Sequence, residues 1–277
     1  MDPHLQPDVD QIEYDLLLEA IYQAYGYDFR SYSQASMRRR IQHHMTMQSI
    51  EHISYLQGRI LRDREAFAHL LSDLTINVTE MFRDPEFYKA FREKVVPLLR
   101  THPYLKIWHA GCSTGEEIYS MAILLMEEGL YERCHIYATD IDHQVLEQAK
   151  RGIFPASALK KYTQNYQRSG GKAAFSDYYT ARYDNVIMDA VLKRHLIFAD
   201  HDLATDQVFG EMQVIFCRNV LIYFNKNLQQ RVFDLFHESL DLGGMLCLGS
   251  KESLRSARCE GSFEVVDIHH KIYRKRY

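Results

Sequence analysis

The sequence lacks the features that mark membrane-spanning and secreted proteins. No apolar run approaches the roughly 20 residues that a transmembrane helix needs, and the acidic start MDPHLQPDVDQ contains no signal-peptide core. The five cysteines form no CxxC pair. Cys217 and Cys247 lie in strand-like apolar runs, where a free thiol acts as a small hydrophobe. These absences favour a reduced, cytoplasmic protein.

No charge of one sign dominates the chain. Lysine and arginine total 33, aspartate and glutamate total 37, and the formal net charge is −4, which gives no general attraction to nucleic acid or to a membrane surface. Any electrostatic recognition must therefore be local. The 14 histidines show no metal-ligand spacing, so no metal site is expected, and no Ser/His/Asp or Cys/His arrangement stands out. The 277 residues suffice for one large or two small domains.

Residues 106–119, KIWHAGCSTGEEIY, predict a buried strand, a Gly-x-x-x-Gly turn and a helix. An α/β sheet presents a small ligand to a helix N-terminus in this way. No Gly-Lys-Ser/Thr follows Gly115 and the pattern is not Gly-x-Gly-x-x-Gly, so neither a phosphate loop nor a dinucleotide turn is expected. The acidic helix start at Glu116 and Glu117 favours a ligand with hydroxyls and positive charge, such as S-adenosylmethionine.

The two glutamates can divide their roles in two ways. Ser113-x-x-Glu116 fits a capping box, which gives Glu116 a structural role and makes Glu117 the better ligand candidate. If Thr114 is the cap instead, the two glutamates exchange roles.

Two aspartates follow the next predicted strand, HIYATD. Asp140 ends that strand, where an acidic residue accepts hydrogen bonds from ribose hydroxyls in α/β nucleotide-binding folds, and we favour this role over a turn role. Asp142 precedes a predicted helix and is expected to be its N-cap.

The chain changes character along its length. Residues 12–76 predict an all-helical segment, in which Met37, Ile41 and Met45 form a stripe that faces a core. After a helix start at Asp84-Pro85, with Asp84 as N-cap, strands alternate with helices, which predicts a doubly wound, mostly parallel α/β sheet. The last strands, within 262–274, are typical of a closing antiparallel hairpin.

A Gly-Gly joint at residues 170–171 and the tyrosine-rich run 177–188 predict a small antiparallel insertion. We therefore expect a helical domain over 1–84, an α/β domain over 85–277 and an inserted β subdomain over about 170–197.

Two polar segments could contribute to a ligand site. In NVTEMFR, Asn77, Thr79 and Arg83 lie at spacings of two and four, which an extended segment that ends in a turn could aim at one point; the alternative is a hinge. Arg218 and Asn219 follow the buried strand QVIFC at the usual ligand crevice of an α/β sheet. Tyr223 follows them as either a site residue or a packing residue.

A basic cluster lies on the polar side of the helix that carries the Met37 stripe. It consists of Arg38, Arg39 and Arg40, with His43 and His44 nearby. Such a cluster is either a solvated face or a docking patch for an acidic or phosphorylated partner.

Taken together, the blocks NVTEMFRD, AGCSTGEEIYS, ATDIDHQVLEQA and IFCRNVLIYF resemble the CheR family of chemotaxis receptor glutamate methyltransferases, in matching order and spacing from about residue 15 to the end. The resemblance implies a class I S-adenosylmethionine methyltransferase fold with a helical N-terminal domain and an inserted antiparallel subdomain. It also implies S-adenosylmethionine as cofactor, S-adenosylhomocysteine as product and the cytoplasmic methylation helices of chemoreceptors as partners, with neither nucleic acid nor membrane insertion involved.

The resemblance also assigns roles to residues. It implies that the basic helix, with Arg38, Arg39 and Arg40, docks on the receptor, and that Tyr223 is the tyrosine near the reacting methyl group. His201-Asp202-Leu203 stands where several members have Asn-Leu. In some members the inserted subdomain holds a receptor's C-terminal pentapeptide. The residues implied to contact the cofactor are Asn77, Thr79, Arg83, Gly111, Glu117, Asp140, Asp202, Leu203, Arg218 and Asn219.

The implied reaction forms a γ-glutamyl methyl ester. A glutamate carboxylate, with a reference pKa of about 4.3, is ionised near neutral pH and needs no general base. Arg83 is expected to orient the carboxylate or to close over the cofactor, and Tyr223 to shape the methyl site. Two alternatives stay open. One is a nucleic-acid methyltransferase that uses the arginine patch, which the acidic net charge disfavours. The other is a non-catalytic module that senses the cofactor, which the intact motifs disfavour.

Overall fold

The computed structural model describes residues 8–75, 79–255 and 257–277, so the predicted site residue Asn77 lies outside the described residues. The chain divides into two compact units. Unit 1 comprises Met1–Ile76 and Tyr223–Gln229, and unit 2 comprises Asn77–Ile222 and Gln230–Tyr277. None of the helices in the described residues is both long enough and apolar enough to cross a lipid bilayer.

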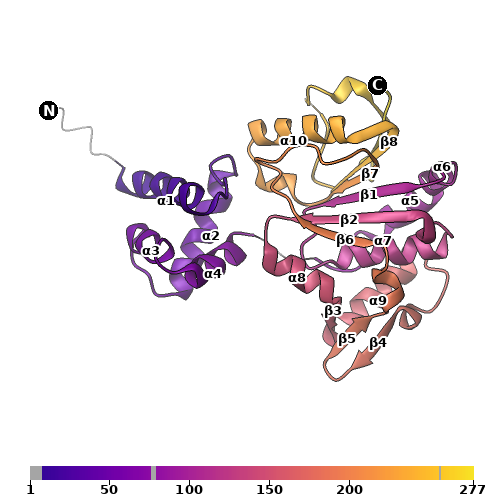
Figure 1. Ribbon diagram of the computed structural model, residues 1–277, viewed down its shortest axis with the longest axis horizontal. Helices are drawn as coiled ribbons and strands as arrows, with labels where there is room; N and C mark the ends of the chain where they lie inside the picture. Colours follow the sequence, from indigo (N-terminus) through magenta and orange to yellow (C-terminus); the bar gives the residue numbers. More distant parts are fainter. Residues whose placement is uncertain (1–7, 76–78, 256) are drawn as a thin grey trace. The chain divides into compact units, whose positions relative to one another are not determined.

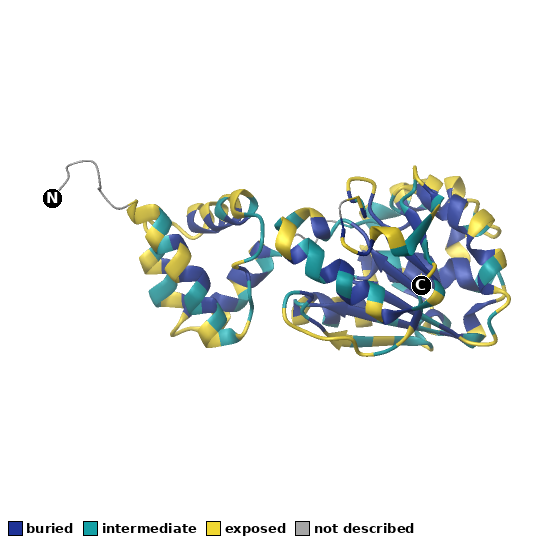
Figure 2. Cartoon of the chain, turned by 90° about the horizontal axis from the view of Figure 1, so that it is seen from above, coloured by how far each residue is buried: buried dark blue, intermediate teal, exposed yellow. Residues whose placement is uncertain are grey.

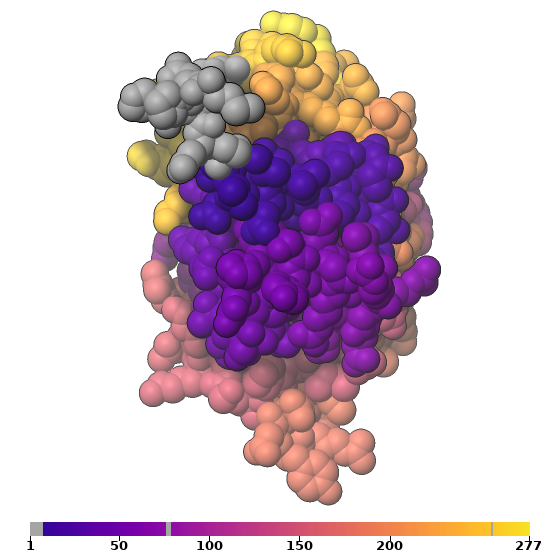
Figure 3. Space-filling model, turned by 90° about the vertical axis from the view of Figure 1, so that its left-hand side faces the viewer, coloured from indigo at the N-terminus to yellow at the C-terminus, as the bar shows by residue number. Residues whose placement is uncertain are grey.

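Residues 8–75 of unit 1 form the helices α1 (Val9–Tyr25), α2 (Gln34–Met47), α3 (Ile53–Ile60) and α4 (Arg64–Leu74). Figure 3 shows them as one closely packed body. Asp8 caps α1 by accepting a hydrogen bond from the backbone N–H of Gln11 at 3.1 Å, and α4 has an equivalent aspartate cap. The predicted stripe on α2 is confirmed, because Met37, Ile41 and Met45 are all buried.

The short segment Tyr223–Gln229 belongs to unit 1, although it follows the α/β motif in sequence. Its backbone pairs with the stretch that precedes α2: the N–H of Ser33 donates to the carbonyl of Tyr223 at 2.7 Å, and the N–H of Asn225 donates to the carbonyl of Ser31 at 3.0 Å. Phe224 is buried there. The expected domain limits, 1–84 and 85–277, assigned this segment to the α/β domain, since nothing in its local sequence reports this long-range pairing.

Unit 2 is built on a seven-stranded sheet with the order β6-β2-β1-β7-β8-β10-β9. Five strands are parallel, and β10 runs antiparallel to both of its neighbours, β8 and β9. The predicted doubly wound, mostly parallel sheet with a closing hairpin is confirmed. The strands are β1 (Leu105–Ala110), β2 (Cys134–Asp140), β6 (Leu196–Asp200), β7 (Met212–Cys217), β8 (Leu240–Leu248), β9 (Phe263–Asp267) and β10 (Ile272–Lys275).

Helices cover this sheet, and Figure 2 shows that its central strands are buried whereas the helices expose their outer faces. The central strands β1 and β7 have long buried runs, as expected for a parallel sheet covered on both faces. Asp142 caps α8 as predicted, accepting from the N–H of Gln144 at 2.8 Å. The helices are α5 (Pro85–Lys94), α6 (Val96–Leu99), α7 (Glu116–Glu127), α8 (His143–Arg151) and α10 (Lys226–Ser239).

The inserted subdomain is a three-stranded antiparallel sheet with the order β3-β5-β4. Its strands are β3 (Ile153–Pro155), β4 (Tyr179–Arg182) and β5 (Asn185–Met188), and Figure 1 shows them grouped beside α9 (Leu159–Arg168). The predicted segment 170–197 contains β4 and β5 but misses β3 and α9, because three residues ending in proline give too short a signal. It also includes the first residues of β6, which belongs to the main sheet.

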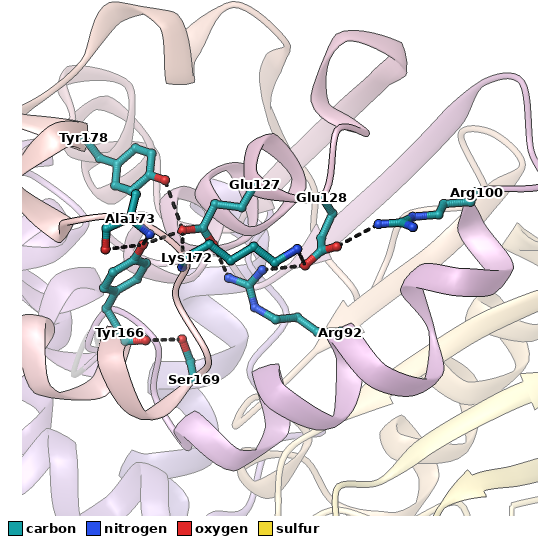
Figure 4. A network of polar contacts seen from close by, with 9 residues as sticks. All are labelled: Arg92, Arg100, Glu127, Glu128, Tyr166, Ser169, Lys172, Ala173 and Tyr178. Carbon is teal, nitrogen blue, oxygen red and sulfur yellow. Dashed lines mark hydrogen bonds and ion pairs between the residues drawn. The ribbon is translucent and has the colours of Figure 1, made fainter.

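A buried polar network ties the insertion to the main domain (Figure 4). Glu127, at the end of α7, accepts hydrogen bonds from the hydroxyls of Tyr166 and Tyr178 and forms an ion pair with Arg92. The next residue, Glu128, forms ion pairs with Arg92 and Lys172, each at 2.8 Å. Because both carboxylates are buried and paired, the insertion is held firmly against α5 and α7.

Candidate active site

The carboxyl ends of β1, β2 and β7 meet at one edge of the sheet, and a buried arginine links the segments around them. The guanidinium of Arg218, directly after β7, donates to Glu117 Oε2 and to Asp84 Oδ2, each at 2.8 Å. It also lies 4.1 Å from the ring centroid of Phe87. The side chain is 2% exposed. One guanidinium therefore joins the start of α5 to the start of α7.

Glu117 shares its second oxygen with a histidine of β1. Its Oε1 lies 3.1 Å from Nδ1 of His109, whose ring stacks on Phe216 in β7. Burial acts to raise the pKa of Glu117, but Arg218 and His109 outweigh it and hold the pKa below its usual value. Glu117 is therefore an ionised residue at the centre of the cluster, and the sequence did not reveal His109.

The segment before α5 is held in an unusual backbone conformation. Phe82 and Asp84 both have positive φ angles, 51° and 58°, which are costly for residues with a Cβ. Ser120 Oγ accepts from the N–H of Phe82 at 2.8 Å, and Asn165 donates to the carbonyl of Met81 at 3.0 Å. Neighbouring elements thus impose the conformation that positions the predicted site residue Arg83.

Asp84 is the N-cap residue of α5 and proline follows at the first helical position, as predicted, but the carboxylate of Asp84 has another partner. Its carboxylate forms no capping hydrogen bond to the helix and binds Arg218 instead. The carbonyl of Arg83 lies 3.4 Å and 3.5 Å from the two terminal nitrogens of the same guanidinium. The local Asp-Pro pattern cannot predict that Asp84 pairs with Arg218, which lies 134 residues away in the chain.

The glycine turn approaches its neighbours closely. Gly111 has φ +75°, and a Cβ there would lie 2.5 Å from a methyl carbon of Val220. The N-cap of α7 is Gly115, with φ +98°, so the predicted capping box is wrong and neither Ser113 nor Thr114 takes the cap position. Glu116 accepts a hydrogen bond from the hydroxyl of Thr114 at 2.6 Å.

Asp140 ends β2 as predicted and is buried against this turn. Its Oδ2 accepts from the N–H of Ser113 at 2.8 Å, and its Oδ1 accepts from the N–H of Asp142 at 3.1 Å. Burial raises the pKa of Asp140 to about 6. Each carboxylate oxygen can accept a second hydrogen bond, so the residue can still receive a ligand hydroxyl.

The loop after β7 depends on a residue that sequence reasoning missed. Asn219 has φ +64°, and the N–H groups of Asn219, Val220 and Leu221 all donate to the carboxylate of Glu252, at 3.0, 2.9 and 2.8 Å. Glu252 is buried, 4% exposed, in the connection after β8. Because Glu252 lies in the polar run GSKES, the sequence around it gives no signal of an internal role.

The contacts of the other predicted residues are made outside the Arg218 cluster. Asp202 accepts from the N–H of Ala204 at 2.8 Å within its own turn, and Leu203 is buried. Thr79 is half-buried. Tyr223 is described with unit 1, where the guanidinium of Arg40 lies 4.4 Å from its ring centroid.

The basic cluster of α2 divides by burial. Arg39 is exposed, and Arg38 is half-buried, donating to Gln11 at 2.7 Å. Arg40 is 6% exposed, donates to the carbonyl of Leu74 and stacks on Tyr223. The interpretation of Arg40 as a residue on an exposed docking face is therefore corrected, because its helical position turns it into the core of unit 1.

Comparison with known proteins agrees with this arrangement. Residues 77–272 match the family model described as CheR methyltransferase, SAM binding domain, and residues 12–75 match the CheR methyltransferase, all-alpha domain. The chain is 54% identical to Cher3 of Pseudomonas putida, covering 95% of this chain and 97% of that protein. It is 34% identical to a chemotaxis protein methyltransferase of Vibrio anguillarum, covering 70% of each, and 26% identical to one of Listeria innocua, covering 90% and 92%.

The donor set fits the cofactor that the family model names. Three carboxylates, Asp84, Glu117 and Asp140, outnumber the buried arginine, Arg218, so the candidate site carries a local excess of negative charge. An ammonium and a sulfonium group suit such a site, and an acidic residue at the end of β2 suits ribose hydroxyls. The chain belongs to the CheR methyltransferase family, and its cofactor is S-adenosylmethionine.

Proposed function

We propose that this methyltransferase acts on glutamate side chains in the cytoplasmic domain of chemoreceptors and forms γ-glutamyl methyl esters that serve sensory adaptation. The observation that carries the proposal is the presence, in one chain, of both the all-alpha and the SAM-binding domains of the family. Relatives named chemotaxis protein methyltransferases support it.

We assign the cofactor to the edge of the sheet that contains Glu117, Asp140, Arg218 and Asn219. When bound, S-adenosylmethionine supplies the methyl group: a carboxylate oxygen bonds to the methyl carbon as the carbon–sulfur bond breaks and its electron pair leaves with sulfur. The acceptor carboxylate is ionised at neutral pH, so the protein needs to align the reactants rather than move a proton. Arg83 orients the acceptor.

The test is incubation with labelled S-adenosylmethionine and candidate receptor cytoplasmic domains, followed by treatment with base. Glutamyl methyl esters release volatile methanol in base, whereas N-methyl groups do not. Base-labile label on a receptor is expected. Base-stable label, label on RNA or DNA, or cofactor binding with no transfer to any receptor would each contradict the proposal.

Docking on the receptor is expected to depend on Arg39, which is exposed on α2. Arg39→Glu should raise the KM for the receptor several-fold and weaken the salt dependence of methylation, since a surface charge acts mainly on encounter. Cofactor affinity should not change. The matched control is Arg59→Glu, which makes the same charge reversal at an exposed position of α3. Equal effects of the two variants would show that only the overall charge matters.

Cofactor affinity is expected to fall in acid because of Asp140. The group titrates at about pH 6 in the folded protein, owing to burial, and the ionised form is the better acceptor for a ribose hydroxyl. Affinity for S-adenosylhomocysteine, measured by calorimetry from pH 8 to pH 5, should therefore be constant above pH 6 and fall below it by up to about tenfold per pH unit. Asp140→Asn should bind more weakly at pH 8 with a flatter profile; the same acid loss in this variant would assign it to another group.

A further inference from the structure

Glu252 concentrates an unusual number of backbone hydrogen bonds on one carboxylate. Besides the three N–H groups of the loop after β7, it accepts from the N–H of Gly249 at 2.6 Å. Oε1 serves Val220 and Leu221, and Oε2 serves Asn219 and Gly249. Three successive N–H groups that converge on one point form an anion-binding concavity. In this protein an internal carboxylate fills it, so that concavity is not where a ligand carboxylate binds.

The arrangement fixes the backbone that carries Arg218. Asn219 needs its left-handed conformation, φ +64°, for its N–H to point at Glu252 together with the next two. That conformation costs free energy, and the four hydrogen bonds that the loops donate to the charged acceptor Glu252 offset this cost. The guanidinium one residue earlier bridges Asp84 and Glu117, so the position of the loop sets the geometry of the whole ion cluster.

The same loop also packs against the glycine turn before α7. Val220 is held through its N–H by Glu252, and a methyl carbon of its side chain lies 2.5 Å from where a Cβ on Gly111 would be. Gly249 leaves equally little room, because a Cβ there would lie 2.7 Å from Glu252 Oε2 and 2.8 Å from the nitrogen of Asn219. Glu252 therefore fixes the geometry of the Arg218 ion cluster and the contact between the loop after β7 and the glycine turn after β1.

We infer that Glu252 is a positioning residue for cofactor binding: it touches neither cofactor nor acceptor, and it acts by holding residues 218–221 in the binding conformation. This inference rests on the proposed placement of the cofactor beside Arg218 and Asn219. It does not depend on the identity of the methyl acceptor, because cofactor binding is measured without one.

The experiment compares Glu252→Gln with Glu127→Gln. Glutamine keeps the shape of the Glu252 side chain, but its NH2 group is a donor and therefore cannot accept from two of the four backbone N–H groups. Glu127 is a buried carboxylate at the far end of α7 from Glu116, about 16 Å along the helix, and its partners lie in the network of Figure 4. Both variants should lose stability. Only Glu252→Gln should lose affinity for S-adenosylhomocysteine in calorimetry, by about tenfold or more.

Hydrogen exchange without any ligand gives a second readout. The amides of Asn219, Val220, Leu221 and Gly249 should lose protection in Glu252→Gln and keep it in Glu127→Gln. If Glu252→Gln does not fold, Gly249→Ala tests the same contact, because its methyl group displaces the carboxylate without removing the charge. It should lower cofactor affinity in the same direction.

Asn219→Gly distinguishes a failure of the inference about Glu252 from a failure of the proposed cofactor placement. It keeps the left-handed conformation and removes the amide that we place beside the cofactor. If Asn219→Gly weakens cofactor binding and Glu252→Gln does not, Glu252 is a structural residue only and the inference is wrong. If neither changes affinity, the cofactor is not at this loop, and the site assignment falls together with the inference.

Discussion

Replacing Arg218 by methionine should destabilise the protein and abolish measurable cofactor binding. The guanidinium is buried and neutralises Glu117 and Asp84, each at 2.8 Å. Methionine fills part of the volume against Phe87 but leaves the buried Glu117 charge without its main partner. Removal of one member of a buried pair costs about 3–5 kcal/mol, and the lower end is expected here because Asp84 is half exposed. Chemical denaturation and calorimetry with S-adenosylhomocysteine measure the two effects.

The double variant Arg218→Met/Glu117→Gln is the control that identifies the cause. It should recover part of the lost stability, because the uncompensated carboxylate is gone, but not cofactor binding. In the wild type the pKa of Glu117 lies below its usual value, so the stability it contributes is present above about pH 4.3 and is lost as pH falls. The stability gap between Arg218→Met and wild type should therefore narrow toward pH 4. A constant gap, or a double variant no more stable than Arg218→Met, would contradict this account.

Arg218→Lys tests geometry rather than charge. The planar guanidinium of Arg218 binds carboxylates on two different elements while it stacks on Phe87. A lysine ammonium is a single compact charge and cannot reproduce this geometry. We expect stability between those of wild type and Arg218→Met, with cofactor binding still strongly reduced. Wild-type affinity in the lysine variant would show that charge alone is sufficient.

Much of this fold could be predicted from the sequence because local patterns determine it. The period of the apolar residues gave the helices of unit 1 and the alternating strands and helices of unit 2, and Asp142 was recognised as a cap from its position alone. The strand β3 was missed because pairing with β5, not its own three residues, makes it a strand. The pairing of Tyr223 and Asn225 with the chain before α2 was missed for the same reason.

The candidate site shows the same division. Glu117, Asp140 and Arg218 were predicted from their places after buried strands or at a helix start, which topology brings to one edge of the sheet. His109 and Glu252 were not, since each gains its role from a partner at least eight residues away. Arg40 was misassigned because a run of arginines on a polar helix face predicts exposure, and only packing shows which member turns inward.

Replacing Arg83 by alanine should nearly abolish methyl transfer while leaving the fold intact. Three contacts of neighbouring residues hold the segment around Arg83: Ser120 accepts from the N–H of Phe82, Asn165 donates to the carbonyl of Met81, and Arg218 binds Asp84. These contacts also hold Phe82 and Asp84 at positive φ angles, a conformation that is costly for residues with a Cβ. The substitution therefore removes the charge that we propose orients the acceptor and leaves these three contacts in place.

The expected loss in kcat is about 100-fold to 1000-fold, the range for removing one fixed electrostatic donor from an active site. Circular dichroism and thermal unfolding should stay close to wild type. Arg83→Lys is the matched variant: it keeps the charge but not the planar donor pair, so partial activity is expected. The proposed role predicts a defect in turnover that saturating receptor and cofactor do not rescue. Recovery of full turnover at saturation would reduce Arg83 to a binding contact, and near-normal turnover at all concentrations would remove it from the reaction.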